Sequence, residues 1–203
     1  MKIAIIGTGN VGGALATRWA QAGHEINLGV KDTSNFKGKA LLDNPNTKVY
    51  STREAVGRSE VILVATPPHI AVDLANSFGD LSGKTLIDAT NSVRSRPEPY
   101  ATAFHAFADL TQAGVVKCFN STGFENMIDP VYGDVAIDMF MAGGDAGAKS
   151  VAEELAKDAG FENCYDFGGP ERVELLEQFA LSWINLAIFQ KQGRGIAFKV
   201  IKR

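Results

Sequence analysis

The chain has 203 residues, of which 45% are hydrophobic and 21% are charged, and its formal net charge at pH 7 is −3. These values are typical of an ordinary globular domain, and the slightly negative charge disfavours nucleic acid as a partner. No apolar run approaches the roughly 20 residues that a membrane-spanning helix needs, and two cysteines are too few for a metal quartet or a disulfide framework. We therefore expect a cytoplasmic protein with reduced thiols, no metal site and no membrane partner.

Short apolar runs alternate along the chain with longer segments of helical periodicity. Six runs have the composition of buried parallel strands and cover residues 2–7, 25–29, 61–66, 85–90, 115–120 and 137–143. Amphipathic helices are predicted over residues 11–23, 69–79, 97–110 and 146–160. Residues 31–49 are predicted to be mostly loop, with one short helix. The alternation predicts one α/β domain over residues 1–203, a Rossmann-type, doubly wound and mainly parallel sheet with helices on both faces.

Residues 168–203 are predicted to form a long C-terminal helix and a tail. The helix begins near Pro170, a proline suited to the first helical position, and ends near Gln192. Its second half, ALSWINLAIF, is apolar almost all round. Such a helix is buried on more than one side, against the sheet or against a second subunit. We therefore expect a homodimer whose substrate cleft lies near the interface.

Three glycines follow the first predicted strand in the spacing G-x-G-x-x-G. Gly7 allows a tight turn, Gly9 lets the backbone approach a pyrophosphate, and Gly12 lets the helix and the strand pack closely. The N-terminus of the following helix offers free N–H groups and a positive dipole end to the phosphates. Because the motif lies between a strand and a helix and leads to a second strand, it predicts dinucleotide binding.

The end of the second strand bears on the choice between NAD(H) and NADP(H), because an acidic residue there usually binds the adenosine ribose. We expect this strand to end at Gly29, which puts Val30 at the position of the carboxylate. Valine cannot accept a hydrogen bond from a 2′-hydroxyl, whereas the neighbouring Lys31 can pair with a 2′-phosphate. These residues favour NADP(H). The alternative is that Asp32 holds the ribose and that the cofactor is NAD(H).

Polar residues follow three other predicted strands, at the sheet edge where ligands bind in this fold. Ala65, Thr66 and Pro67 form one such loop, in which Thr66 is a candidate N-cap for the next helix. Asn91 and Asn120 end two further strands and suit a carboxamide or ribose hydroxyls. For each asparagine, ordinary turn chemistry is an equally open alternative.

Several long segments together resemble the F420-dependent NADP oxidoreductase family. They are IGTGNVGGALATRWAQAGHEINLGVKD, VILVATPP, LIDATNSV, VVKCFNSTG and AGGDAGAKSVAEELAKDAGFENCYDFGGPERVELLE. The cytosolic reductase domain of six-transmembrane metalloreductases is similar in the same places, and the resemblance extends over nearly the whole chain. It implies a Rossmann-type domain that binds NADP(H) and passes hydride to or from a deazaflavin, a flavin or another small acceptor.

The resemblance also implies roles for individual residues. Thr8, Gly9, Asn10 and Val11 match the family's pyrophosphate loop. Thr66 and Pro67 match the loop beside the nicotinamide ribose, and Phe119 with Asn120 match the loop on its far side. Gly29, Val30 and Lys31 match a glycine-serine-arginine triplet that grips the 2′-phosphate. Valine lacks the serine hydroxyl and lysine lacks the bidentate fork of arginine, and Ser92 stands where relatives often have proline.

Hydride transfer requires mainly orientation and a dry cleft, because the cofactor carries the reactive bond. His69, which follows the Pro-Pro turn, is a candidate proton donor to a reduced acceptor; the alternative is a helix-start histidine without a catalytic role. No other catalytic residue is identified. Three functions stay open: a reductase of a deazaflavin-like or flavin-like acceptor, an NADPH-dependent imine or carbonyl reductase, and a non-catalytic NADP(H) sensor. Turnover of an acceptor would separate the enzymes from the sensor.

Overall fold

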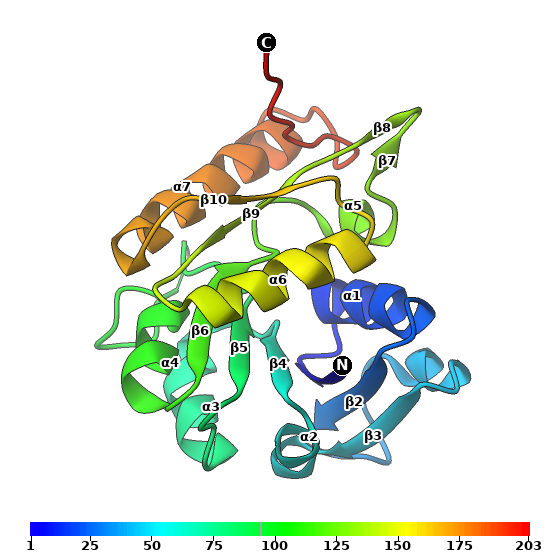
Figure 1. The fold of residues 1–203 in the computed structure, drawn as a ribbon, viewed down its shortest axis with the longest axis vertical. Helices are drawn as coiled ribbons and strands as arrows, with labels where there is room; N and C mark the ends of the chain where they lie inside the picture. Colours follow the sequence, from blue (N-terminus) through cyan, green and yellow to red (C-terminus); the bar gives the residue numbers. More distant parts are fainter. Residues whose placement is uncertain (94) are drawn as a thin grey trace.

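A doubly wound α/β sheet forms the centre of the molecule. The computed structural model describes residues 1–93 and 95–203. Its eight-stranded sheet has the order β10-β9-β6-β5-β4-β1-β2-β3 (Figure 1). The strands are β1 (Lys2–Ile6), β2 (Glu25–Val30), β3 (Thr47–Ser51), β4 (Val61–Val64), β5 (Thr85–Asp88), β6 (Gly114–Cys118), β9 (Met139–Ala142) and β10 (Cys164–Asp166). The sheet is parallel from β3 to β6, whereas β9 pairs with β6 in the antiparallel direction and β10 runs parallel to β9. The predicted Rossmann-type fold is confirmed.

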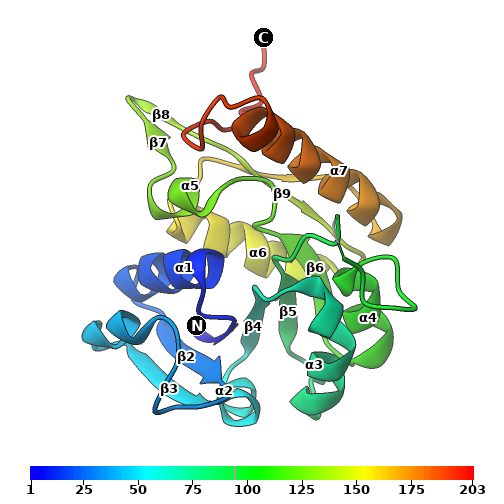
Figure 2. The ribbon, with the colours of Figure 1, turned by 180° about the vertical axis from the view of Figure 1, so that it is seen from behind.

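Helices cover both faces of this sheet. They are α1 (Asn10–Gln21), α2 (Thr52–Arg58), α3 (Ala71–Phe78), α4 (Ala103–Leu110), α5 (Phe124–Ile128), α6 (Ala146–Asp158) and α7 (Val173–Ile184). Buried residues of α1 and α6 belong to one apolar cluster, which includes Ile3 and Ile5 of β1. Buried residues of α2, α3, α4 and α7 belong to a second cluster, which includes Ala4 and Ile6 of β1. Helix α6 lies in front of the sheet in Figure 1, and α3, α4 and α7 lie in front in the reverse view of Figure 2. Consecutive residues of β1 therefore face opposite layers, which explains the continuous apolar run.

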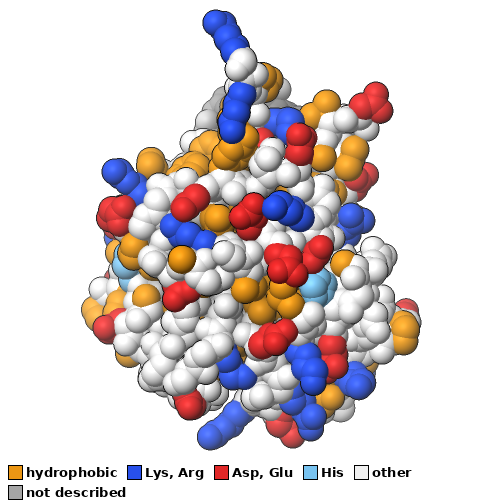
Figure 3. Space-filling view, viewed as in Figure 1, with side chains coloured by type: hydrophobic (Ala, Val, Ile, Leu, Met, Phe, Trp, Pro, Cys, Tyr) orange, Lys and Arg blue, Asp and Glu red, His pale blue; other side chains and the backbone are white. Residues whose placement is uncertain are grey.

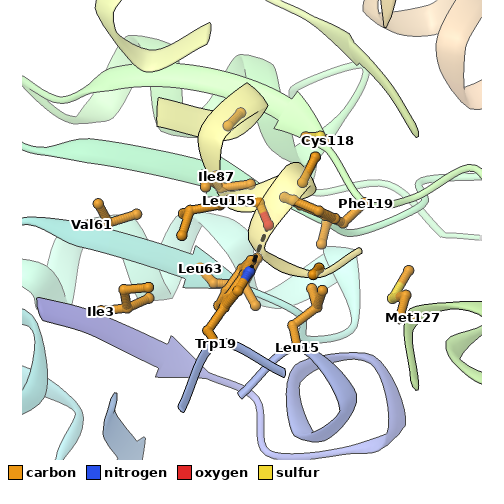
Figure 4. Close-up of a cluster of buried hydrophobic side chains, with 14 of the residues drawn as sticks. Ile3, Leu15, Trp19, Val61, Leu63, Ile87, Cys118, Phe119, Met127 and Leu155 are labelled. Carbon is orange, nitrogen blue, oxygen red and sulfur yellow. Dashed lines mark hydrogen bonds between the residues drawn. The ribbon is translucent and has the colours of Figure 1, made fainter. Parts of the chain in front are cut away.

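Trp19 fixes α1 against the sheet and against α6. Its side chain is fully buried, and its ring N–H donates a hydrogen bond of 2.8 Å to the carbonyl of Leu155 (Figure 4). The ring meets that of Phe119 edge to face, at a centroid distance of 5.5 Å. This packing holds the last turn of α1 against α6 and against Phe119.

Several elements were not predicted from the sequence. Strand β3 and helix α2 follow the short 3-10 turn Lys39–Asp43 that was expected within residues 31–49. Strand β3 lies at the edge of the sheet and is mostly half-buried or exposed, so it has no apolar run. Four further elements were also not predicted, and each has five residues or fewer. They are β7 (Val131–Tyr132), β8 (Val135–Ala136), α5 and β10. Helix α4, predicted over residues 97–110, begins only at Ala103.

The predicted C-terminal helix divides into three parts. They are a 3-10 turn at Pro170–Arg172, α7, and a π-helical turn at Asn185–Phe189. Val173 and Leu176 are buried against the sheet, whereas Leu175, Leu186 and Ile188 are exposed. Among the described residues, no helix has both the length and the apolar character needed to cross a membrane.

Candidate functional site

The turn between β1 and α1 has steric requirements that only glycine meets. Gly7 has φ 103°, and a Cβ added there would lie 2.5 Å from the carbonyl oxygen of Ala65. A Cβ added at Gly12 would lie 2.0 Å from the carbonyl oxygen of Gly7. Both glycines therefore allow β1, α1 and the end of β4 to approach one another. At Gly9 an added Cβ would meet no described atom within 4 Å, so this side of the loop faces open space.

Helix α1 begins at this open space. Its N-cap, Gly9, offers no side-chain acceptor, and no acidic residue occupies the first turn. The first N–H groups of a helix have no intrahelical partner, and together with the helix dipole they favour an anion. The loop from Thr8 to Asn10 can therefore hold a phosphate without help from a charged side chain.

A cavity of about 280 Å³ extends from the glycine loop toward the end of β2. Its lining brings together the carboxyl ends of β1, β2 and β4, and consists of Ile6, Gly7, Thr8, Gly29, Val30, Lys31, Asp32, Asn35, Phe36, Thr52, Thr66, Ile70 and Leu74. A larger hollow of about 630 Å³ lies between α1 and residues 37–47 and shares Thr8, Gly9 and Asn10 with the loop. The smaller cavity is the one that joins the sequence-predicted residues of three strands.

The prediction that the second strand ends at Gly29 is wrong. Gly29 continues the strand in register with Tyr50, and Val30 pairs with Ser51 as its last residue. The glycine is needed for packing, because a Cβ there would lie 2.5 Å from Cδ1 of Ile6. Lys31 is therefore the first residue beyond the strand. It is exposed at the cavity and forms no ion pair with any described residue.

The carboxylate of Asp32 is engaged in a local turn. One of its oxygens accepts hydrogen bonds from the Ser34 hydroxyl at 2.6 Å, from the Ser34 N–H at 2.9 Å and from the Asn35 N–H at 3.3 Å. The bond from the Ser34 hydroxyl is the main cause that lowers the pKa of this carboxyl below its usual value. Asp32 thus shapes the loop that carries Lys31, and the oxygen used in this turn is not free for a ribose.

Thr8 anchors the same loop to the glycine turn. Its hydroxyl donates a hydrogen bond to the carbonyl of Lys37. Gly38 has φ 94°, and a Cβ there would lie 2.8 Å from the Thr8 carbonyl oxygen. The segment after β2 is therefore held against the glycine loop and closes one side of the cavity.

Asn91 and Asn120 form a reciprocal pair beyond the ends of β5 and β6. The Asn91 amide donates to the backbone carbonyl of Asn120 at 3.0 Å, and the Asn120 amide donates to Oδ1 of Asn91 at 3.0 Å. Oδ1 of Asn120 is buried and has no partner within the described part of the chain. Because a buried polar atom without a partner is costly, this oxygen is suited to accept a hydrogen bond from a ligand. Asn91, whose amide is already engaged, orients its neighbour.

Three other predicted site residues differ in their surroundings, and one of them, Thr66, lines the 280 Å³ cavity. Phe119 has φ 60° and a fully buried side chain in the core beside Trp19, so only its backbone can face a ligand (Figure 4). Thr66 is not an N-cap, since the 3-10 turn Pro68–Ile70 is preceded by Pro67. Its buried hydroxyl has no partner in residues 1–93 or 95–203. His69 is exposed and makes no hydrogen bond with the described residues, and its role as a proton donor stays a prediction.

Sequence reasoning missed a buried charged cluster next to the asparagine pair. Lys117 contacts Asp88 at 3.0 Å and Glu177 at 2.6 Å, and the three side chains are at most 5% exposed. The signal was present, because Asp88 and Lys117 are charged residues within apolar strand runs, and such residues are rarely buried without a partner. The described residues contain no group of side chains that could bind a metal ion.

Known proteins resemble the chain over most of its length. The sequence model of the family described as NADP oxidoreductase, coenzyme F420-dependent, matches residues 2–92. The chain is 28% identical to the F420-dependent NADP reductase of Methanothermobacter marburgensis, over 93% of each protein. It is 29% identical to the metalloreductase STEAP3 of Rattus norvegicus over 79% of this chain and 32% of that protein.

A solved structure agrees over the full length. A candidate F420-dependent NADP reductase from Arthrobacter sp. FB24 superposes with a TM-score of 0.83 at 25% identity, over 100% of both chains. The resemblance inferred from the sequence is confirmed. The chain is similar over its full length to proteins named F420-dependent NADP reductase, and its residues 2–92 match the family model.

Proposed function

We propose that the protein is an NADP(H)-dependent oxidoreductase that transfers hydride between the nicotinamide and a deazaflavin, a flavin or another small acceptor. The observation that carries this proposal is the cavity that joins the glycine loop to Lys31 and Thr66. It lies at the carboxyl ends of β1, β2 and β4. In this sheet β1 and β4 flank the switch point, where dinucleotides bind in doubly wound folds.

The residues present fit such a cofactor. The open side of Gly9 and the uncapped start of α1 would hold the pyrophosphate, and Lys31 would pair with the 2′-phosphate. Oδ1 of Asn120 would accept a hydrogen bond from the carboxamide or from a ribose hydroxyl. When bound, the nicotinamide supplies the hydride. The protein's own part is to hold and orient it in a dry cleft, which requires no nucleophile or acid–base pair.

The preference for NADP(H) follows from the groups at the end of β2. Val30 offers no carboxylate to a 2′-hydroxyl and none to repel a 2′-phosphate. Lys31 is exposed and without an ion-pair partner among described residues, so its ammonium is available as a point charge. Asp32 is engaged with Ser34 and Asn35.

The acceptor is tested by following the loss of NADPH absorbance with one acceptor at a time. We expect turnover with coenzyme F420 or with a flavin, because relatives bear the name F420-dependent NADP reductase. Turnover with a cyclic imine alone would favour an imine reductase. Stoichiometric NADPH binding without turnover of any acceptor would contradict the proposal and favour a sensor.

We also propose that the protein is a homodimer that uses its C-terminal end. Leu175, Leu186 and Ile188 are exposed on α7 and the turn after it, and Val131 and Val135 are exposed on the β7–β8 hairpin. The hairpin and the tail project from the same end of the molecule, where Figure 3 shows apolar side chains at the surface. Leu186 and Ile188 follow the end of α7 that lies nearer the hairpin, and exposed apolar side chains at one end of a molecule are typical of an interface. Sedimentation at micromolar concentration should show twice the chain mass of 21.7 kDa, and a monomer alone would contradict this.

The surface charges and the two cysteines bear on the compartment in which the protein works. Acidic and basic side chains are interspersed on the face shown in Figure 3. Cys118 and Cys164 are free thiols, which suits a reducing compartment such as the cytoplasm.

A further inference from the structure

A lysine at the end of β6 bridges two carboxylates in the interior. The ammonium of Lys117 lies 3.0 Å from Oδ2 of Asp88, the last residue of β5, and 2.6 Å from Oε1 of Glu177 on α7. Lys117 and Asp88 are fully buried, and Glu177 is 4% exposed. Three charges thus meet in the interior between the sheet and the C-terminal helix.

The same three side chains hold the backbone that follows β5. The Lys117 ammonium donates to the carbonyl of Thr90 at 2.6 Å, and Oδ1 of Asp88 accepts from the N–H of Thr90 at 2.9 Å. The second oxygen of Glu177 accepts from the N–H of Ser92 at 2.9 Å. Residues 90–92 are therefore fixed from both ends, by a strand on one side and by α7 on the other.

Stability alone does not explain such a cluster. The desolvation of buried ions often exceeds their mutual attraction, and replacement of buried ion pairs by well-packed apolar residues is often neutral or stabilising. Each charged group here is instead directed at a specific backbone group or partner. The geometric consequence is a single conformation of residues 90–92.

The loop fixed in this way carries Asn91. Asn91 lies between Thr90 and Ser92 and is bonded in both directions to Asn120. We propose that Glu177 is a positioning residue: through Lys117 and the Ser92 N–H it holds the 90–92 loop so that the asparagine pair presents Oδ1 of Asn120 to the nicotinamide end of the cofactor. This inference rests on the proposed function, and it makes α7 part of the cofactor site although α7 contributes nothing to the 280 Å³ cavity.

The test compares whole-cofactor binding with binding of the adenosine half. Glu177→Leu removes both acceptors, and Glu177→Gln keeps the size of the side chain but loses the charge. For each variant, the Kd of NADPH is measured by its fluorescence and the Kd of adenosine 2′,5′-bisphosphate by displacement of NADPH. We expect Glu177→Leu to weaken NADPH about tenfold while the bisphosphate is unchanged. Glu177→Gln should also raise the Kd of NADPH relative to that of the bisphosphate, but by a smaller factor than Glu177→Leu does.

Lys84→Met is the matched control. The Lys84 ammonium also bonds two backbone carbonyls, those of Val56 and Ser59, but it precedes β5, at the other end of the strand from Asp88. Lys84→Met should lower the midpoint of unfolding and leave the ratio of the two Kd values unchanged. If Glu177 had a purely structural role, Glu177→Leu would likewise lower the midpoint of unfolding without changing this ratio.

The inference would be overturned by a folded Glu177→Leu protein in which the ratio of the two Kd values is that of the wild type, whether both values are unchanged or both rise together. If Glu177→Leu does not fold, a wild-type ratio in Glu177→Gln has the same meaning. Failure of the wild-type protein to bind either ligand would instead overturn the proposed function.

Discussion

Replacement of Gly9 by alanine is expected to weaken NADPH binding about a hundredfold, or about 2.8 kcal/mol, with little change in the free energy of unfolding. The new methyl group would meet no described atom within 4 Å, and φ of −77° suits alanine. In the proposed cofactor site, the free volume beside Gly9 is the space that a pyrophosphate would need to reach the N–H groups of α1. Charge-assisted hydrogen bonds of this kind contribute about 1.5–3 kcal/mol each.

The variant separates binding from folding. A fluorescence titration with NADPH and a urea denaturation curve, both on Gly9→Ala, give the two free energies. A loss of stability equal to the loss of binding would mean that Gly9 is needed for the fold. An unchanged Kd would place the pyrophosphate elsewhere.

Replacement of Gly12 by alanine should instead damage the fold. The added methyl would lie 2.0 Å from the carbonyl oxygen of Gly7 and 3.1 Å from its carbon, and backbone atoms cannot rotate away. Helix α1 would have to move off β1, against the packing of Trp19 in the core. Overpacking costs about 1–3 kcal/mol and sometimes more. We expect Gly12→Ala to reach at least the upper end of this range and to lose NADPH binding, because the glycine loop moves with α1.

Gly13→Ala is the matched control for this variant. Gly13 is in the same helix, and the nearest atom to an added methyl, the Thr8 carbonyl oxygen, is 3.8 Å away. Alanine in a helix interior is favoured over glycine by about 1 kcal/mol, so this variant should be as stable as the wild type or more stable. Urea denaturation midpoints compare the two. Equal midpoints would contradict the close contact between α1 and β1.

The predicted fold depended on local signals, and those signals were strong. The glycine motif and the apolar runs are properties of short segments, and residues facing both layers make a buried strand uniformly apolar. Strand β3 and α2 lacked such a signal, because an edge strand is half exposed and α2 has only seven residues. The end of β2 was misplaced because the need for glycine at position 29 comes from Ile6 and Ala55, which only the folded chain brings next to it.

The residues of the candidate site could be predicted where they belong to a local sequence motif. They could not be predicted where residues far apart in the sequence come together. Six of the residues identified from the sequence at the ends of β1, β2 and β4 line one cavity: Gly7, Thr8, Gly29, Val30, Lys31 and Thr66. The side chain of Phe119 points into the core, because a left-handed backbone conformation turns it away from the loop. Glu177 reaches Lys117 from 60 positions away along the chain, and no periodicity links the two residues.

A titration of the pure protein with NADPH and with NADH tests whether Lys31 binds a 2′-phosphate. Lys31→Ala is titrated in the same way. The charge-matched control is Lys48→Ala, because Lys48 is an exposed lysine of β3 that lies outside the cavity. We expect the wild type and Lys48→Ala to bind NADPH at least about tenfold more tightly than NADH, a difference of about 1.4 kcal/mol, and Lys31→Ala to lose most of this preference. Equal affinities in the wild type, or a preference for NADH, would contradict the role of Lys31 and would assign the ribose to Asp32.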